Sequence, residues 1–260
     1  MPTESILLRS DVGGVTTLTL NRPAQFNALS VELLSALQAA LDAIAKDTSV
    51  RVVVIAGAGK AFCAGHDLKQ MRADPSKASM QRLFAQCGRV MTSLTELPQP
   101  VIARVHGIAT AAGCQLVAQC DLAVAADSAR FAVSGINVGL FCATPAVALS
   151  RNIGRKQAME MLLTGDFIDA PEALRRGLLS RVVPLEKLDA EVAKLTDSIR
   201  GKSAVAVALG KGMFYRQLEL GLSGAYELAS ETMACNMMSD DAIEGIDAFM
   251  AKRPPVWKAR

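Results

Sequence analysis

Residues 61–68, AFCAGHDL, and residues 107–115, GIATAAGCQ, are the stretches that decide the fold and the site of this chain. Each follows a short run of β-branched and apolar residues, 51–56 for the first and 101–105 for the second. Each is rich in Gly and Ala, so a ligand can approach its backbone closely. The second leads into a helix, whose N-terminus favours negative charge. Two such loops can direct two N–H donors at one oxyanion, although the same small residues also suit plain tight turns.

Strand-like and helix-like segments alternate up to about residue 155, and helical patterns dominate after it. The predicted strands are 15–20, 51–56, 101–105 and 122–125, and the predicted early helices begin at Ser30 and at about Lys77. The predicted later helices are 155–164, 170–177, 187–200, 204–219, 223–237 and 240–251. Alternation of this kind predicts an α/β fold with a mostly parallel sheet and crossover helices.

Length and composition limit the classes of function. The chain has 260 residues, is 51% hydrophobic and carries a net charge of +3, which suits one domain with a small appended piece. Its Lys and Arg residues are dispersed, so we expect no nucleic-acid partner. No apolar run reaches membrane-spanning length, so we expect no membrane partner. The six cysteines show no paired spacing, and the N-terminal residues resemble neither a signal nor a transit peptide, so a cytoplasmic protein is predicted.

Six blocks of sequence fall in the order found in one known family. They are LNRPAQFNALS (20–30), AFCAGHDL (61–68), PQPVIARVHG (98–107), AAGCQLVAQCDLAVAAD (111–127), AMEMLLTGDFIDAPEALRRGLLSRVVP (158–184) and DAIEGIDAFMAKRPP (241–255). Together they resemble the crotonase (enoyl-CoA hydratase/isomerase) family from about residue 5 to the end. Residues 137–149, NVGLFCATPAVAL, resemble the third branch of the animal enoyl-CoA-hydratase-domain-containing proteins.

The resemblance implies a crotonase-like spiral of ββα units over residues 1–195 and a C-terminal helical trimerisation region over residues 196–260. It implies a homotrimer or a dimer of trimers. The expected ligand is an acyl-CoA thioester. No metal and no cofactor are expected beyond the coenzyme A that forms part of the substrate.

The resemblance also assigns the site. The backbone N–H groups of His66 and Ala112 would form the oxyanion hole, which binds the thioester carbonyl and stabilises the enolate. The residues expected to bind substrate are Ala64, Gly65, Asp67, Leu68, Asn137, Phe141, Phe249 and Lys252. The last two lie in the C-terminal helical segment, where the alternative is a solvated helix end whose cations complement the dipole.

The chain departs from the family at both catalytic glutamates. Gln115 and Gly135 stand at their positions, and no carboxylate occurs between Asp127 and Glu160. An amide is not a useful base, and one general base contributes about 10²–10⁴-fold to a rate. Family isomerases often need only the carboxylate near position 135, which is also missing. Hydration and double-bond shift are therefore expected to be very slow or absent.

Three functions remain open at this point. The first is an enzyme acting on an enoyl-CoA, the second a catalytically silent acyl-CoA binder, and the third a decarboxylase or hydrolase that uses the same oxyanion hole. Some family decarboxylases carry a His in the AGHD context of His66, together with a tyrosine near position 140, where this chain has Leu140 and Phe141. The plainer alternative is that only the backbone N–H of His66 matters.

Two further patterns have plain structural explanations. Cys63, His66, His106 and Cys114 have side chains that bind zinc, but four ligands would have to converge, and buried Cys is usually a small apolar residue. Cys142 is a conceivable thioesterase-like nucleophile. A packed thiol beside Phe141 is the simpler interpretation.

Overall fold

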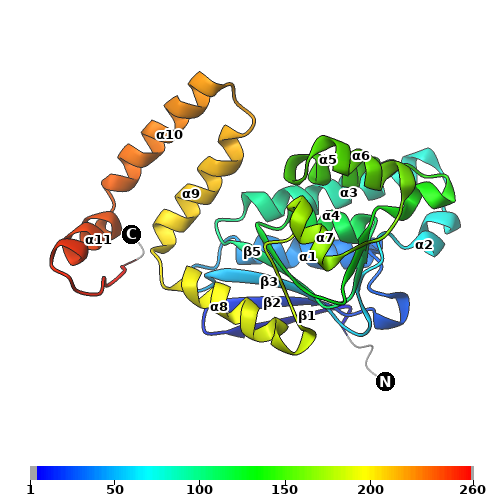
Figure 1. The fold of residues 1–260 in the computed structure, drawn as a ribbon, viewed down its shortest axis with the longest axis horizontal. Coiled ribbons are helices and arrows are strands. Elements are labelled where there is room, and N and C mark those ends of the chain that lie inside the picture. The colour runs from blue at the N-terminus through cyan, green and yellow to red at the C-terminus, as the bar shows by residue number, and fades with distance from the viewer. Residues whose placement is uncertain (1–4, 259–260) are drawn as a thin grey trace.

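The computed structural model describes residues 5–258 and contains two sheets (Figure 1). The main sheet has the strand order β1-β2-β3-β5-β7-β10, in which only the β1–β2 pair is antiparallel. Its strands are β1 (Leu7–Val12), β2 (Val15–Leu20), β3 (Val52–Gly57), β5 (Val101–Val105), β7 (Leu122–Ala126) and β10 (Arg181–Val183). The second sheet contains β4 (Ala61–Cys63), β6 (Ile108–Thr110), β8 (Arg130–Ala132) and β9 (Ile168–Asp169). The predicted α/β class is confirmed.

The predicted helices are present, and two more, at 68–73 and 143–152, were not predicted from the sequence. The helices are α1 (Val31–Ile44), α2 (Leu68–Ala73), α3 (Lys77–Glu96), α4 (Ala112–Gln119), α5 (Ala143–Asn152), α6 (Arg155–Thr164), α7 (Ala170–Arg176), α8 (Leu188–Arg200), α9 (Ala204–Gln217), α10 (Leu222–Met237) and α11 (Asp240–Met250). Ser30 caps α1 because its side chain accepts a hydrogen bond from the N–H of Leu33. Three 3₁₀ turns occur at Pro23–Gln25, Ser134–Val138 and Leu185–Lys187.

Both faces of the main sheet are buried at its central strands β3, β5 and β7, which explains why these strands are continuous apolar runs. On β3, Val53 and Ile55 face the large core that includes residues of α1, α3 and α4. Val52 and Val54 face the opposite way, into a smaller core formed with α8. Figure 1 shows α8 on the side of the sheet away from α3 and α4.

Helix α4 packs directly on the second sheet at Gly113. A Cβ atom at Gly113 would lie 2.1 Å from the carbonyl oxygen of Cys63, the last residue of β4. No other residue fits at that separation. The close approach brings the loop after β4 to the N-terminus of α4, which joins the two loops that the sequence singles out.

Helices α9, α10 and α11 form an arm that extends away from the sheets (Figure 1). Lys211 of α9 fastens the arm to the core, since its Nζ donates to the Leu94 and Gln99 carbonyls and pairs with Asp121 at 2.7 Å. The hydroxyl of Tyr215 donates to the other oxygen of Asp121, also at 2.7 Å. Helix α8 spans the predicted boundary at residue 195 and packs on the main sheet, so the arm begins at α9.

Two Gly→Ala substitutions test the packing of α4. Gly113→Ala should lower the free energy of unfolding by about 3 kcal/mol or more, because the added methyl overlaps the backbone of β4. Gly88→Ala, inside α3 with open space around the site, should raise it by about 0.5–1 kcal/mol. Urea denaturation measures both. A Gly113→Ala protein as stable as the wild type would contradict the close approach.

Candidate active site

The two Gly/Ala-rich loops touch at Gly65. This residue has φ +93°, and a Cβ atom there would lie 2.9 Å from Ala111 Cβ and 3.3 Å from the amide nitrogen of Ala112. Both the backbone conformation and the space therefore require glycine. Ala111 itself has φ +51°, an unfavourable conformation for a non-glycine residue. The strained junction sets the end of the first loop against the start of α4.

Two backbone N–H groups are left without acceptors at this junction. The Leu29 N–H donates to the Gly65 carbonyl, and the Asp67 N–H donates to the Leu29 carbonyl. This pairing turns the N–H of His66 away from Leu29. Ala112 is the first residue of α4, where helical N–H groups have no intrahelical acceptor. Among residues 5–258, neither of these two N–H groups forms a hydrogen bond.

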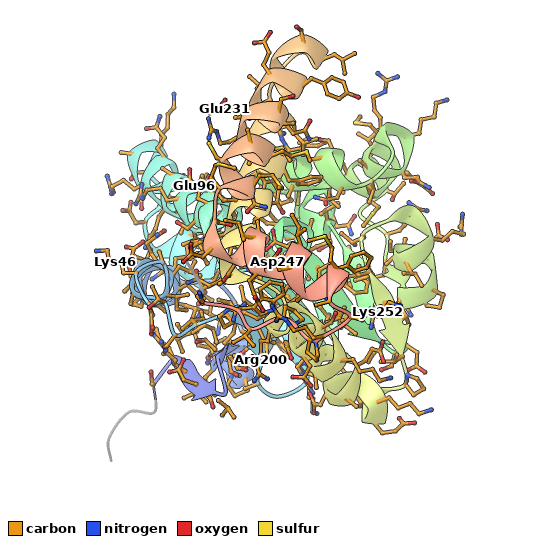
Figure 2. All side chains as sticks on the ribbon, turned by 90° about the vertical axis from the view of Figure 1, so that its left-hand side faces the viewer. Lys46, Glu96, Arg200, Glu231, Asp247 and Lys252 are labelled. Atoms are coloured by element: carbon orange, nitrogen blue, oxygen red, sulfur yellow. The ribbon has the colours of Figure 1, made fainter. Side chains whose placement is uncertain are left out.

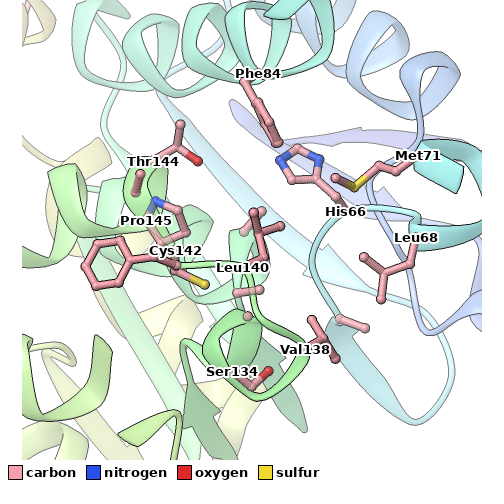
Figure 3. A pocket seen from close by; sticks show the side chains of 16 residues that line it. His66, Leu68, Met71, Phe84, Ser134, Val138, Leu140, Cys142, Thr144 and Pro145 are labelled. Carbon is pink, nitrogen blue, oxygen red and sulfur yellow. The ribbon is translucent and has the colours of Figure 1, made fainter. Parts of the chain in front are cut away.

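A cavity of about 250 Å³ opens beside the junction (Figure 3). Six of the predicted site residues line it, namely Ala64, His66, Leu68, Ala112, Gly135 and Phe141. Met71, Phe84, Val138, Leu140 and Pro145 complete a largely apolar wall. Of the described residues that line the cavity, none is Asp, Glu, Lys or Arg. Such a wall suits an acyl chain.

The space beside Gly135, one of the two positions where the resemblance predicts a glutamate in family hydratases, is occupied by neighbouring atoms. A Cβ atom at Gly135 would lie 2.5 Å from the carbonyl oxygen of Leu140 and 2.7 Å from Cys142 Sγ. A side chain therefore does not fit here without movement of the 135–142 segment. Gln115, at the other position, is 4% exposed within α4. Its Oε1 has no hydrogen-bond partner among the described residues.

Five predicted binding residues lie outside the cavity wall, and two of them, Phe249 and Lys252, belong to the arm. Gly65 sits at the loop junction. Asp67 caps α2 and pairs with Arg22 at 2.9 Å, and the Arg22 hydrogen bond lowers the pKa of this carboxyl. Asn137 donates to the Gly165 carbonyl at 3.4 Å. Phe249, which is 85% exposed, belongs to the arm.

Lys252 lies just beyond α11, also on the arm. Figure 2 shows it at the end of that helix, in front of the core. Its φ of +54° closes the helix before the C-terminal residues turn back. Lys252 and Phe249 therefore take no part in the cavity of their own chain.

The cysteine and histidine patterns do not assemble a second reactive centre. Burial raises the pKa of Cys63 and Cys114 to about 12, so both are thiols. Burial also raises the pKa of Cys142, which argues against a thiolate nucleophile. His106 Nε2 lies 2.9 Å from the Gly59 carbonyl. Within the part of the chain that the structure describes, no three His, Cys, Asp or Glu side chains group as metal ligands.

Sequence reasoning missed Met71, Phe84 and Val138 as lining residues. Met71 and Phe84 lie on the short helix α2 and on α3, where apolar residues at helical spacing are expected in a core. Val138 is the last residue of a 3₁₀ turn that the sequence pattern does not predict. Only the meeting of these elements in space identifies them as cavity residues.

Comparison with known proteins agrees with this geometry. The family model described as enoyl-CoA hydratase/isomerase matches residues 11–260. The chain belongs to this family. A Xenopus laevis relative, "Enoyl-CoA hydratase domain-containing protein 3, mitochondrial", is 48% identical over 244 residues, which cover 94% of this chain and 83% of the relative. The resemblance to the crotonase family and to this animal branch is thereby confirmed.

Two solved structures confirm the crotonase fold. An enoyl-CoA hydratase from Mycobacterium smegmatis has a TM-score of 0.97 and 60% sequence identity, over 98% of this chain and 99% of that chain. Human enoyl-CoA hydratase domain-containing protein 3 has a TM-score of 0.95 and 44% identity, over 97% of this chain and 100% of that chain.

The cytoplasmic location predicted from the sequence is wrong. Relatives from frog, rat, mouse, human and zebrafish are all named as mitochondrial proteins. Unpaired thiols indicate a reducing compartment but do not distinguish one such compartment from another. Over residues 5–258, no helix combines the length and the apolarity needed to cross a membrane.

Proposed function

We propose that this chain binds an acyl-CoA thioester, with the acyl group in the cavity and the thioester oxygen between the N–H groups of His66 and Ala112. The observation that carries the proposal is the junction at Gly65, which sets two unpaired donors beside one apolar cavity. The enoyl-CoA hydratase family supplies the ligand class. The thioester oxygen gains negative charge as an enolate forms, and fixed N–H donors stabilise that charge more than they stabilise the neutral carbonyl.

The same site is poorly equipped to hydrate a double bond. Hydration requires a base to activate water and an acid to protonate carbon, and the cavity wall supplies no carboxylate. Gln115, which is not among the residues that line the cavity, carries an amide in place of a carboxylate, and Gly135 has no room for a side chain. The site can therefore bind a thioester and polarise its carbonyl, but it lacks the groups that efficient water addition requires.

The residues that line the cavity give less support to the two alternative activities, decarboxylation and thioester hydrolysis. A malonyl-type decarboxylase substrate would bury a carboxylate beside no Lys or Arg side chain. A thioesterase would need an activated nucleophile, whereas burial raises the pKa of Cys142. Of the three functions that the sequence leaves open, an acyl-CoA binder with weak or no hydratase activity fits the cavity best.

We further propose that the arm joins three copies of the chain, as a trimer or a dimer of trimers. Large apolar side chains are exposed along it, including Leu222, Tyr226, Met233, Met238, Phe249 and Met250. A group of large apolar side chains exposed on one segment is typical of a protein interface. Phe249 and Lys252, which lie away from the cavity of their own chain, would then be available to a neighbouring subunit.

Hydration assays test the proposed function. Wild type should hydrate crotonyl-CoA and a longer 2-enoyl-CoA at least about 10⁴-fold more slowly than a glutamate-bearing hydratase assayed alongside. Gln115→Glu should fold and gain turnover, because it restores one carboxylate in nearly the same volume. Gly135→Glu should lower the melting temperature, since its Cβ overlaps the Leu140 carbonyl. Efficient turnover by wild type would contradict the assignment.

Sedimentation equilibrium tests the assembly. The 27.4 kDa chain should sediment at three or six times its own mass. Replacing Phe249 and Met250 by Ser should shift the equilibrium toward smaller species, because both side chains are exposed in the single chain. A wild-type protein that stays monomeric at micromolar concentration would contradict the proposed assembly.

A further inference from the structure

The guanidinium of Arg22 spans the backbone bridge between Leu29 and His66. Its Nη1 donates to the Ala28 carbonyl at 2.5 Å, one residue before Leu29. Its Nη2 donates to the carboxylate of Asp67 at 2.9 Å, one residue after His66. Arg22 therefore ties the two sides of the bridge together from outside the cavity, whose described lining residues include neither Arg22 nor Asp67.

The bridge sets the direction of the His66 N–H. Its shorter hydrogen bond runs from the Leu29 N–H to the Gly65 carbonyl at 2.7 Å. Because the peptide between Gly65 and His66 is trans and planar, the His66 N–H points opposite to that carbonyl and away from Leu29. The second hydrogen bond, from the Asp67 N–H to the Leu29 carbonyl, is long at 3.3 Å. The backbone alone holds this side of the bridge weakly, and the Arg22 side chain reinforces it.

The carboxylate of Asp67 uses both of its oxygens. Oδ2 pairs with Arg22, and Oδ1 accepts hydrogen bonds from the N–H groups of Lys69 and Gln70 at 3.1 and 3.2 Å. The side chains of Arg22 and Asp67 are only 17% and 15% exposed. The hydrogen bond from Arg22 lowers the pKa of Asp67, so this carboxyl is ionised at neutral pH. A partly buried pair with several hydrogen bonds restrains its surroundings more than an exposed ion pair does.

The backbone that carries Arg22 is strained and tightly anchored. Phe26 and Asn27 have φ of +50° and +57°, which is unusual for two consecutive residues other than glycine. Asn27 is fully buried, and its Oδ1 accepts from the Arg22 N–H at 2.9 Å. Its Nδ2 donates to the carbonyls of Ala58 and Ala61, each at 2.8 Å. The base of the Arg22 side chain is therefore fixed relative to β4 and to the loop after β3.

We propose that Arg22 and Asp67 are positioning residues that hold the His66 N–H in the direction in which it binds the thioester oxygen. This inference rests on the proposed function and names the side chains on which one of its backbone donors depends. Neither side chain lines the cavity, so neither contacts the acyl group. Loss of the pair should loosen the loop at residues 64–67 and weaken the hydrogen bond to the thioester oxygen, while the contacts with the rest of the ligand stay the same.

Two ligands that differ only at the carbonyl test the inference. Butyryl-CoA has the thioester oxygen, and S-butyl-CoA has a methylene group in place of the carbonyl. In calorimetric titration of the purified full-length protein, wild type should bind butyryl-CoA about 5- to 100-fold more tightly than S-butyl-CoA, the value of two hydrogen bonds. Asp67→Asn, which keeps a helix-capping oxygen, and Arg22→Met, which keeps the aliphatic stem, should each lower this ratio by at least about 3-fold. Arg22→Lys should give an intermediate ratio, because an ammonium lacks the planar fork that reaches both acceptors.

Asp169→Asn is the matched control. Asp169 caps α7 by accepting a hydrogen bond from the Glu172 N–H at 2.8 Å, and it is not among the residues that line the cavity. The substitution therefore removes the charge of a capping aspartate away from the bridge, and the wild-type ratio should be unchanged. A fall in the ratio equal to that of Asp67→Asn would overturn the inference.

The remaining outcomes separate this inference from the proposed function. If wild type binds both ligands equally, the proposed function fails and this inference fails with it. If wild type prefers butyryl-CoA and Asp67→Asn keeps the full preference, only the positioning role is overturned. Equal weakening of both ligands in Arg22→Met would indicate contact with the coenzyme A moiety and would also overturn that role. Thermal melting checks that each variant folds, and if Arg22→Met does not, the wild-type ratio in Arg22→Lys overturns the inference.

Discussion

The site depends on backbone contacts that only glycine permits. Gly113 lets α4 approach the Cys63 carbonyl, and Gly65 lets the loop after β4 meet the start of that helix. These contacts place Gly65, the residue before His66, next to the amide nitrogen of Ala112. The cost is local strain at Ala111, which the buried surroundings of α4 maintain. The position of the two N–H donors therefore depends on the backbone and not on the acid and base side chains that hydration requires.

The surroundings of the two donors are closely packed at Gly135 and carry no carboxylate among the described lining residues. The segment 135–142 folds back so that the Leu140 carbonyl and Cys142 Sγ occupy the space beside Gly135. The result is an apolar cavity whose one basic side chain among the described lining residues is the neutral, unpaired His66. The function proposed for such a site is carbonyl polarisation without water activation. Its selectivity for the acyl group then depends on apolar contact.

The sequence predicted most of the architecture because local signals were strong. The runs 51–56 and 101–105 became β3 and β5, and Ser30 caps α1 as its position indicates. The six blocks predicted the family, and the two loops predicted the junction. The closure at Gly135 was not predictable, because it depends on contact between residues five and seven positions apart in an irregular segment. The role of Phe84 in lining the cavity was not predictable, because the sequence of α3 has the pattern of an ordinary amphipathic helix.

We propose above all that the two backbone amides bind and polarise a thioester carbonyl. Infrared difference spectroscopy of butyryl-CoA, labelled with ¹³C at the thioester carbon, reports on that carbonyl without requiring turnover. We predict that its stretching band shifts to lower frequency on binding to the wild type. The shift should be lost in Gly65→Ala, whose methyl would force the loops apart, and kept in Gly139→Ala, which also has positive φ but open space around it. If the carbonyl band of the bound thioester has the same frequency as that of the free ligand in a water-excluding solvent, the two amides do not polarise the carbonyl.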